Sequence, residues 1–83
     1  MLQIKKLVEL RKASIYIVTR GLQDAYKKAK NNILRGDFNA VQFRKREPKS
    51  LKRWYFRINE KYRAIGYFYN NETFLVTIID DHQ

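Results

Sequence analysis

Apolar positions recur every three or four residues through the first 35 residues, the spacing of one face of an amphipathic helix. The stripe consists of Ile4, Val8, Ile15, Val18, Leu22, Ala25, Ala29 and Ile33, with Arg11 as its polar member. Gly21 interrupts the stripe, and Gly36 stands where a helix C-terminal cap belongs. We therefore predict two antiparallel helices joined near Gly21, with one continuous helix as the alternative. The β-branched stretch at residues 14–19 is also compatible with a strand.

From Ala40 onward the pattern changes to alternation with period two, which is typical of half-buried strands. Strands are predicted at residues 40–46, 54–58, 62–69 and 72–79. Residues 59–61 and 70–71 are the predicted turns, and Pro48 ends any regular element in the basic connector, residues 47–53. The pattern predicts a single α+β domain over residues 1–83, in which an N-terminal helical hairpin packs on a small antiparallel sheet of three to four strands.

The charge balance narrows the range of partners. The formal net charge is +10, from 18 Lys and Arg against 8 Asp and Glu, which favours nucleic acid, an acidic protein or an anionic membrane surface. The sequence has no cysteine, so disulfides and Cys-based metal sites are excluded. No apolar stretch approaches the roughly 18 residues of a membrane span. Lysines in the opening MLQIKKLVEL disfavour a signal peptide, so we expect a cytoplasmic protein.

Basic residues gather in the second half of the chain: Arg44, Lys45, Arg46, Lys49, Lys52, Arg53, Arg57, Lys61 and Arg63. Aromatic residues are interleaved with them: Phe43, Trp54, Tyr55, Phe56 and Tyr62. Cations beside flat rings suit RNA, because charge holds the phosphates and the rings stack on unpaired bases. A solvated basic face over an ordinary aromatic core is the alternative, and the high net charge favours binding.

The predicted turns fix a strand register. A two-residue turn at 70–71 pairs Ile65 with Val76 and Arg63 with Ile78, and a three-residue turn at 59–61 places Arg57 opposite Arg63. One face then carries Arg57, Arg63, Ile78, Asp80 and His82. The other face carries Phe56, Ile58, Tyr62, Phe68, Leu75 and Ile79, which suits packing under helices. In this register His82 lies four residues beyond the partner of Arg63, roughly 13 Å along the strand.

Two sequence blocks resemble a known family. WYFRINEKYRAI at residues 54–65 and VTIIDDH at residues 76–82 resemble the RelE/ParE superfamily of bacterial toxins, and most of all its HigB branch. Members of that branch carry a Trp-x-x-Arg-Ile/Val-Asn block followed by Trp/Tyr-Arg-Ile, and they end in Val-Asp-Tyr-His. The specific resemblance runs from Trp54 to His82, whereas the first half of the chain is similar only in its helical character.

The resemblance implies a compact α+β toxin that cuts mRNA at the ribosome and is silenced by a cognate antitoxin encoded beside it. Arg63 matches the functional arginine of the family, His82 its terminal histidine and Asp80 the preceding aspartate. Lys49 and Lys52 are both candidates for the family lysine ahead of the tryptophan.

The chain departs from the family at one position of the terminal motif. Asp81 stands where the branch has tyrosine, and an acidic residue there would repel phosphate or raise the pKa of His82.

RNA cleavage of this kind requires a base for the 2′-hydroxyl, an acid for the leaving oxygen, and stabilisation of the pentacoordinate phosphate. Histidine suits either proton role, so we expect His82 to act as general acid or base and Asp80 to orient it. The guanidinium fork matches two phosphate oxygens, which assigns that task to Arg63 and Arg57. The residues expected to bind RNA are Lys49, Lys52, Arg53 and Arg57. This chemistry needs no metal and no cofactor.

Three alternatives stay open. His82 could be an idle residue, and Arg63 could form an ion pair with Glu60 or Glu72. The protein could be a non-catalytic ParE-like toxin that acts by binding DNA gyrase. It could also be a basic module that binds RNA or the ribosome without activity. The expected partners are mRNA, the ribosome and the antitoxin, with gyrase as the alternative and no membrane.

Overall fold

The described chain begins with a strand where the periodicity predicts a helix. In the computed structural model, which describes residues 3–81 (Lys49 for its backbone only), strand β1 spans Lys6–Glu9 and pairs in parallel with strand β5, Thr73–Asp81. The helix prediction is therefore wrong ahead of Arg11. Ile4 and Leu7 are both buried, and their spacing of three also fits a helix, so the local pattern did not separate the two states. Pairing with a distant strand decides the conformation.

Two helices joined near Gly21 follow this strand, as predicted. Helix α1 spans Arg11–Thr19 and α2 spans Gln23–Leu34, so residues 14–19 are helical and the continuous-helix alternative is wrong. Gly21, in the joint between the helices, has φ 66°, and Gly36 has φ 84°. The Gly36 N–H donates to the Ile33 carbonyl at 2.9 Å, which closes α2 as predicted.

The sheet has five strands in the order β1-β5-β4-β3-β2, where β2 is Arg44–Lys45, β3 is Trp54–Arg57 and β4 is Tyr62–Phe68. All pairs except β1 with β5 are antiparallel, so the predicted antiparallel sheet of three to four strands is right only for part of a mixed sheet. The predicted strand at 40–46 is mostly wrong. The 3-10 helix η1, Asn39–Val41, and Gln42 at φ 52° leave only two extended residues.

Asparagine side chains shape both hairpin loops. The Asn59 side chain accepts hydrogen bonds from the N–H groups of Lys61 and Tyr62, both at 2.9 Å, and it closes the predicted three-residue turn. In the next loop Asn70 accepts from Glu72 and Thr73 at 2.9 and 2.8 Å. Glu72 thereby belongs to the turn, so this loop has three residues rather than the predicted two.

A bulge in β5 changes the register of the second hairpin once more. Gly66 pairs with Val76 but Ile65 pairs with Ile78, so Thr77 has no partner on β4. The Thr77 hydroxyl donates to the Ile65 carbonyl at 3.1 Å, which anchors the bulge.

The two changes of register have different effects on the predicted faces. Before the bulge only the longer loop has an effect, and it places Phe74 and Val76 in the core. The prediction that Leu75 faces the helices is therefore wrong. After the bulge the alternation returns to the predicted one, with Ile79 in the core and Asp80 on the other face.

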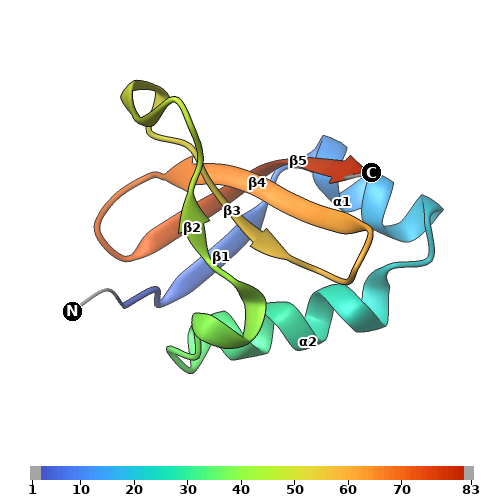
Figure 1. Cartoon of the computed structure of the whole chain (residues 1–83). Helices are drawn as coiled ribbons and strands as arrows, with labels where there is room; N and C mark the ends of the chain where they lie inside the picture. Colours follow the sequence, from blue (N-terminus) through green and yellow to red (C-terminus); the bar gives the residue numbers. More distant parts are fainter. Residues whose placement is uncertain (1–2, 82–83) are drawn as a thin grey trace.

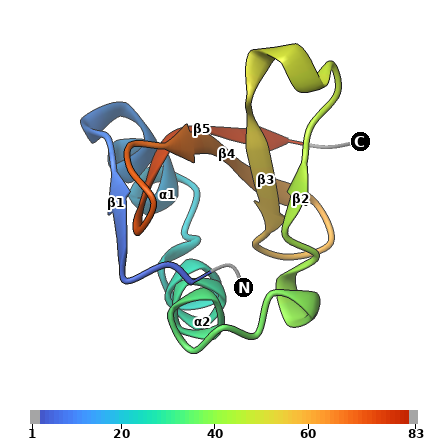
Figure 2. The ribbon, with the colours of Figure 1, turned by 90° about the vertical axis from the view of Figure 1, so that its left-hand side faces the viewer.

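The two faces of the sheet differ in what covers them. Helix α2 lies on one side, whereas the connector, with the 3-10 helix η2 (Lys49–Leu51), projects from the opposite side (Figures 1 and 2). The helices and the inner sheet face share one core, whose most deeply buried large side chains are Ile4, Ile33, Phe56, Phe74 and Val76. No helix within residues 3–81 is long and apolar enough to cross a membrane.

Candidate nucleic-acid interface

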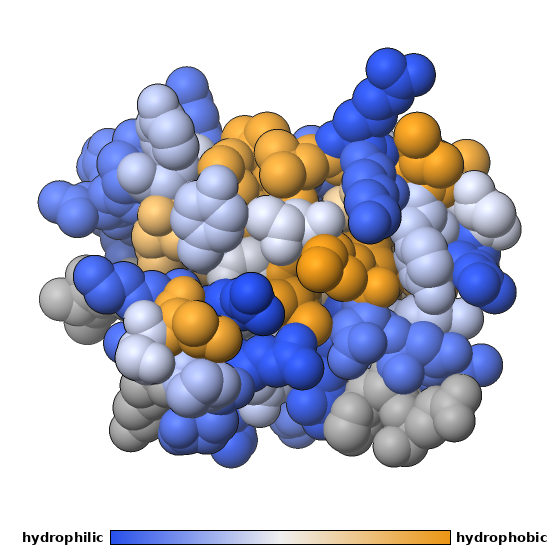
Figure 3. All heavy atoms as spheres, turned by 90° about the horizontal axis from the view of Figure 1, so that it is seen from above, coloured by the Kyte–Doolittle hydropathy of each residue, from blue (hydrophilic) through white to orange (hydrophobic). Residues whose placement is uncertain are grey.

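The sheet face away from α2, called the open face here, carries the alternate residues of each strand. From the strand pairing its members include Arg44, Tyr55, Arg57, Arg63, Ile65, Tyr67, Leu75, Ile78 and Asp80. Seen from above in Figure 3, hydrophobic residues are exposed in the middle of the surface, with hydrophilic side chains around them. A face of this composition offers both charge and apolar contact area.

Arg63 occupies the centre of the charged part. It is the cross-strand partner of Asp80 on one side and of Arg57 on the other, and the second pairing is the predicted one. Its guanidinium carbon lies 4.9 Å from the centroid of the Tyr55 ring, a cation–π arrangement. The stacked ring restricts the guanidinium while its N–H edges stay available to an anion.

The ion pairs considered for Arg63 do not form. It makes no ion pair with any carboxylate in the part of the chain that the structure describes. Glu72 instead pairs with Lys5, with Nζ and Oε2 separated by 3.0 Å, so the proposed pairing of Arg63 with Glu72 is wrong.

Arg63 and Asp80 line one depression of about 290 Å³ in the open face. Its lining is Arg46, Glu47, Tyr55, Arg63, Ile65 and Asp80. Two guanidinium groups, a phenol ring and two carboxylates therefore meet over an apolar floor. The arginines supply fixed donors suited to a phosphate, and the carboxylates can accept a proton or orient a donor.

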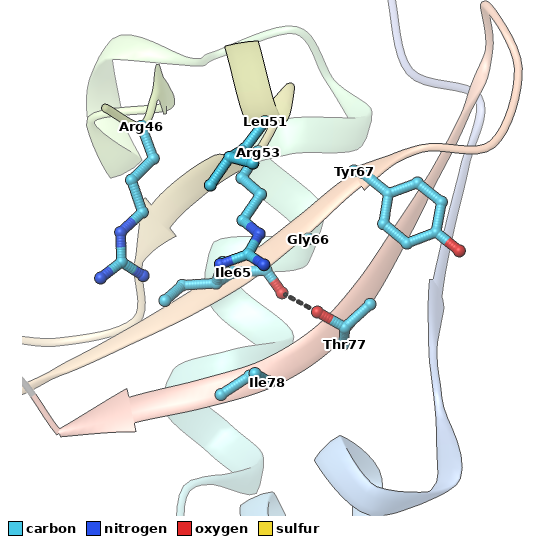
Figure 4. A pocket seen from close by; sticks show the side chains of 8 residues that line it. All are labelled: Arg46, Leu51, Arg53, Ile65, Gly66, Tyr67, Thr77 and Ile78. Carbon is cyan, nitrogen blue, oxygen red and sulfur yellow. Dashed lines mark hydrogen bonds between the residues drawn. The ribbon is translucent and has the colours of Figure 1, made fainter. Parts of the chain in front are cut away.

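A second depression of about 350 Å³ adjoins the first and shares Arg46 and Ile65 with it. Figure 4 shows Arg46 and Arg53 reaching down from the connector end toward the β4 and β5 backbone, with the Tyr67 ring at the other end. The remaining lining is Leu51, Gly66, Thr77 and Ile78. This depression is more apolar than its neighbour, because its described lining holds no carboxylate.

The residues predicted to bind RNA are not gathered in one place. Arg53 lines the second depression, whereas Lys52 lines a different one beside Trp54. Arg57, although opposite Arg63 in the sheet, lines a depression against α2 and not the one that holds Arg63. The Lys49 side chain and all of His82 lie outside the described residues.

The two adjacent aspartates point to opposite sides of β5. Asp80 faces the open side with Arg63, whereas Asp81 is paired with Tyr62 on the helical side. The Asp81 carboxylate lies 3.9 Å from the Lys61 ammonium. Asp81 therefore does not line the Arg63 depression.

Most of the interleaved aromatics belong to the core. The ring centroid of Phe43 lies 5.3 Å from that of Trp54 and 5.3 Å from that of Phe74, and Phe56 is fully buried. Tyr62 packs edge-on against Tyr16 of α1 at 6.2 Å. The predicted stacking of bases is therefore wrong for the buried Phe56, whereas Phe43, Trp54 and Tyr62 are partly buried. Tyr55, together with Tyr67, presents a ring to the open face.

The site residues missed by the sequence are Arg46, Tyr55 and Tyr67. Alternation within the predicted strands places Tyr55 with Arg57 and Tyr67 with Arg63, so that signal was available for both tyrosines. The position of Arg46 depends on the return of the connector, where the Arg46 N–H donates to the Arg53 carbonyl at 2.7 Å. The turn signals in the connector did not predict this pairing, so the position of Arg46 was not predicted.

A polar cluster on the helical side has a structural rather than a binding character. The Tyr26 hydroxyl donates to Glu9 at 2.7 Å, and Lys30 pairs with the same Oε2 oxygen at 3.1 Å. Burial, reinforced by the hydrogen bond to Glu9 and its negative charge, raises the pKa of Tyr26 far above its usual value. This phenol stays neutral and fixes β1 to α2.

Comparison with known proteins adds no relative. No family model matches the chain, and searches of curated proteins and of solved structures find no match either.

Proposed function

We propose that this protein is a RelE/ParE-like toxin of the HigB type, an endoribonuclease that cleaves mRNA at the ribosome. The proposal rests on the resemblance of residues 54–65 and 76–82 to that branch. The observation that carries it is the direct pairing of Arg63 with Asp80 on an uncovered, basic sheet face. The cytoplasm, where mRNA and ribosomes are found, is the location that this function requires.

The roles follow from the chemistry of each group. Arg63, held over the Tyr55 ring, binds the scissile phosphate and offsets its growing negative charge. Arg46, in the same depression, adds a second guanidinium. His82 follows Asp80 by two positions in the sequence, and it acts as the general acid or base, with Asp80 as its orienting carboxylate.

The experiment compares two arginine-to-lysine variants. Arg63→Lys keeps the charge but loses the fork, so cleavage of a reporter mRNA in a translation extract should fall about 10²-fold or more. Arg35→Lys is the matched control, because Arg35 follows α2, on the other side of the sheet, and its guanidinium contacts only Asn32 among the residues described. Wild-type cleavage by Arg63→Lys would remove Arg63 from the chemistry.

Expression in bacteria separates the cleaving toxin from the gyrase-binding one. Wild-type protein should arrest growth with mRNA fragmentation, and co-expression of the protein encoded beside it should relieve the arrest. Growth arrest without mRNA cleavage, accompanied by inhibition of gyrase supercoiling, would contradict the endoribonuclease proposal and favour the ParE-like alternative.

A further inference from the structure

The second depression of the open face has the composition of a slot for a flat ring. Ile65 and Ile78 form its floor, and the side chains of Leu51 and Tyr67 stand at its walls. Three of these apolar groups are exposed, with a relative exposure of 52% for Leu51, 43% for Tyr67 and 49% for Ile78, whereas Ile65 is buried at 5%. Uncovered aromatic and branched side chains beside arginines form a stacking surface of the kind that unpaired nucleobases occupy.

The hydrogen-bonding groups around the slot are mostly donors. The guanidinium groups of Arg46 and Arg53 enter it from the connector side (Figure 4). The Thr77 hydroxyl donates to the Ile65 carbonyl, so that proton is not free for a ligand. The two nearby carboxylates, Glu47 and Asp80, line only the neighbouring depression. Guanidinium donors directed at a flat base favour a base whose edge presents hydrogen-bond acceptors.

Among the nucleobases, guanine presents the best acceptor edge to such donors. Its O6 and N7 accept a bidentate pair from one guanidinium, whereas adenine and cytosine present an amino donor beside their acceptor. Uracil offers a carbonyl but a smaller ring for stacking. The volume of about 350 Å³ is sufficient for one base.

We infer that this slot binds a guanine base of the RNA next to the scissile phosphate, and that Arg53 reads it while Tyr67 stacks on it. The shared residues Arg46 and Ile65 connect the slot with the Arg63 depression, so a phosphate there and its neighbouring base can be held together. The inference rests on the proposed function for the identity of the ligand as RNA, and it adds the base for which the protein is selective.

Binding of uncleavable RNA tests this without requiring activity. Short oligouridines with one central guanosine or adenosine, 2′-O-methylated throughout, are titrated with the wild-type protein at fixed salt and followed by fluorescence anisotropy. The guanosine oligomer should bind about tenfold more tightly than the adenosine oligomer. Equal affinities for the two would overturn the inference.

Two variants locate the preference. Arg53→Lys keeps the charge and should reduce the guanosine-to-adenosine ratio to about one, because lysine lacks the bidentate fork. Tyr67→Ala should weaken binding of the guanosine oligomer about tenfold through lost stacking. The controls are Arg35→Lys and Tyr69→Ala; Tyr69 is 70% exposed and lines neither depression. A ratio unchanged by Arg53→Lys together with binding unchanged by Tyr67→Ala would place the base elsewhere and overturn the inference.

Failures of the two proposals are distinguishable. A protein that prefers guanosine through Arg53 and Tyr67 but cuts no mRNA supports the slot and contradicts the endoribonuclease proposal. Cleavage that depends on Arg63, with equal binding of guanosine and adenosine oligomers, supports the nuclease and overturns the guanine slot.

Discussion

Arg63 on β4 and Asp80 on β5 are direct antiparallel partners, and both side chains line one depression of the open face. The Arg63 guanidinium lies over the Tyr55 ring, and the Asp80 carboxylate forms no ion pair with any cation among the described residues. The partner of Arg63 is thus two positions before His82 in the sequence, where the predicted register placed it four positions before.

The adjacent aspartates give an internal comparison of the two faces of β5. Asp80→Asn should lower RNA cleavage about 10- to 100-fold, the equivalent of one hydrogen bond to a charged group, about 1.5–3 kcal/mol. Asp81→Asn should change cleavage less than about threefold, because the Asp81 carboxylate faces Lys61 on the helical side. Single-turnover cleavage of a reporter mRNA measures both. Equal losses in the two variants would contradict the assignment of Asp80 to the site.

His82→Ala should remove proton transfer while the phosphate-binding arginines stay. General acid–base catalysis contributes about 10²–10⁴-fold, and we expect a loss of cleavage within this range. The thermal midpoint measured by circular dichroism distinguishes lost chemistry from lost folding. A variant that still cuts mRNA at the wild-type rate would make His82 an idle residue. Growth arrest that persists without any mRNA cleavage would point to the gyrase-type toxin.

The connector should contribute to affinity through phosphates. Replacing Lys49, Lys52 and Arg53 together with Ala should reduce the slope of log affinity against log salt by up to about three phosphate contacts, each contributing roughly 0.7–0.9. Titration of an RNA oligomer at several salt concentrations measures the slope. Since Lys52 and Arg53 line different depressions, the single variants should differ. An unchanged slope in the triple variant would exclude the connector from the interface.

Gly66 should tolerate no side chain. A Cβ atom there would lie 1.8 Å from the Leu75 carbonyl oxygen, so Gly66→Ala requires the backbone to move at the bulge. We expect destabilisation of about 1–3 kcal/mol or more from overpacking, measured by urea unfolding. Gly36→Ala is the control: it has open space but a positive φ, and it should lose only about 1–2 kcal/mol of conformational origin. A Gly66→Ala variant as stable as wild type would contradict the register of the β4–β5 pair.

The Tyr26–Glu9 hydrogen bond should give the fold an alkaline limit. The pKa of Tyr26 is raised in the folded state, so its contribution is present below the usual value of 10.0 and is lost as the pH rises above it. Wild-type stability should then fall by up to about 1.4 kcal/mol per pH unit from this group. Tyr26→Phe should lose about 1.5 kcal/mol at neutral pH and lack this part of the decline. Urea unfolding of both proteins across this range gives the difference, and parallel curves would contradict the assignment.

The sequence predicted best where local chemistry decides the structure. Asn59 closes its turn with its own side chain, so the three-residue loop and the Arg57–Arg63 pairing were correct. In the next hairpin Asn70 draws Glu72 into the turn, and a bulge adds Thr77. Each change shifts the alternation of β5 side chains between the two faces by one residue. Asp80 follows both changes and therefore lies on the predicted face, whereas Leu75 follows only the first and lies on the opposite face from the predicted one.

The hydrophobic pattern of the sequence could not predict pairing between distant strands. Leu7 in β1 and Ile4 just before it are buried with a helix-like spacing of three, and β1 is extended only because β5 lies beside it. The second depression could not be predicted for the same reason. Its lining residues Arg46 and Tyr67 come together only because the connector folds back beside β4. No short stretch of sequence contains both halves of such a contact.

The parallel pairing of β1 with β5 has a consequence for synthesis. On the ribosome, a nascent chain that has released only residues 3–72 contains the residues of both helices and of the β3–β4 hairpin, but it lacks the strand that lies between β1 and β4. Phe74, Val76 and Ile79 are also missing from its core. Such a chain exposes apolar surfaces that β5 would cover, so chaperone binding and aggregation compete with folding until β5 is released. The Arg63–Asp80 pair cannot form in it, so the proposed site is complete only after β5 has been translated.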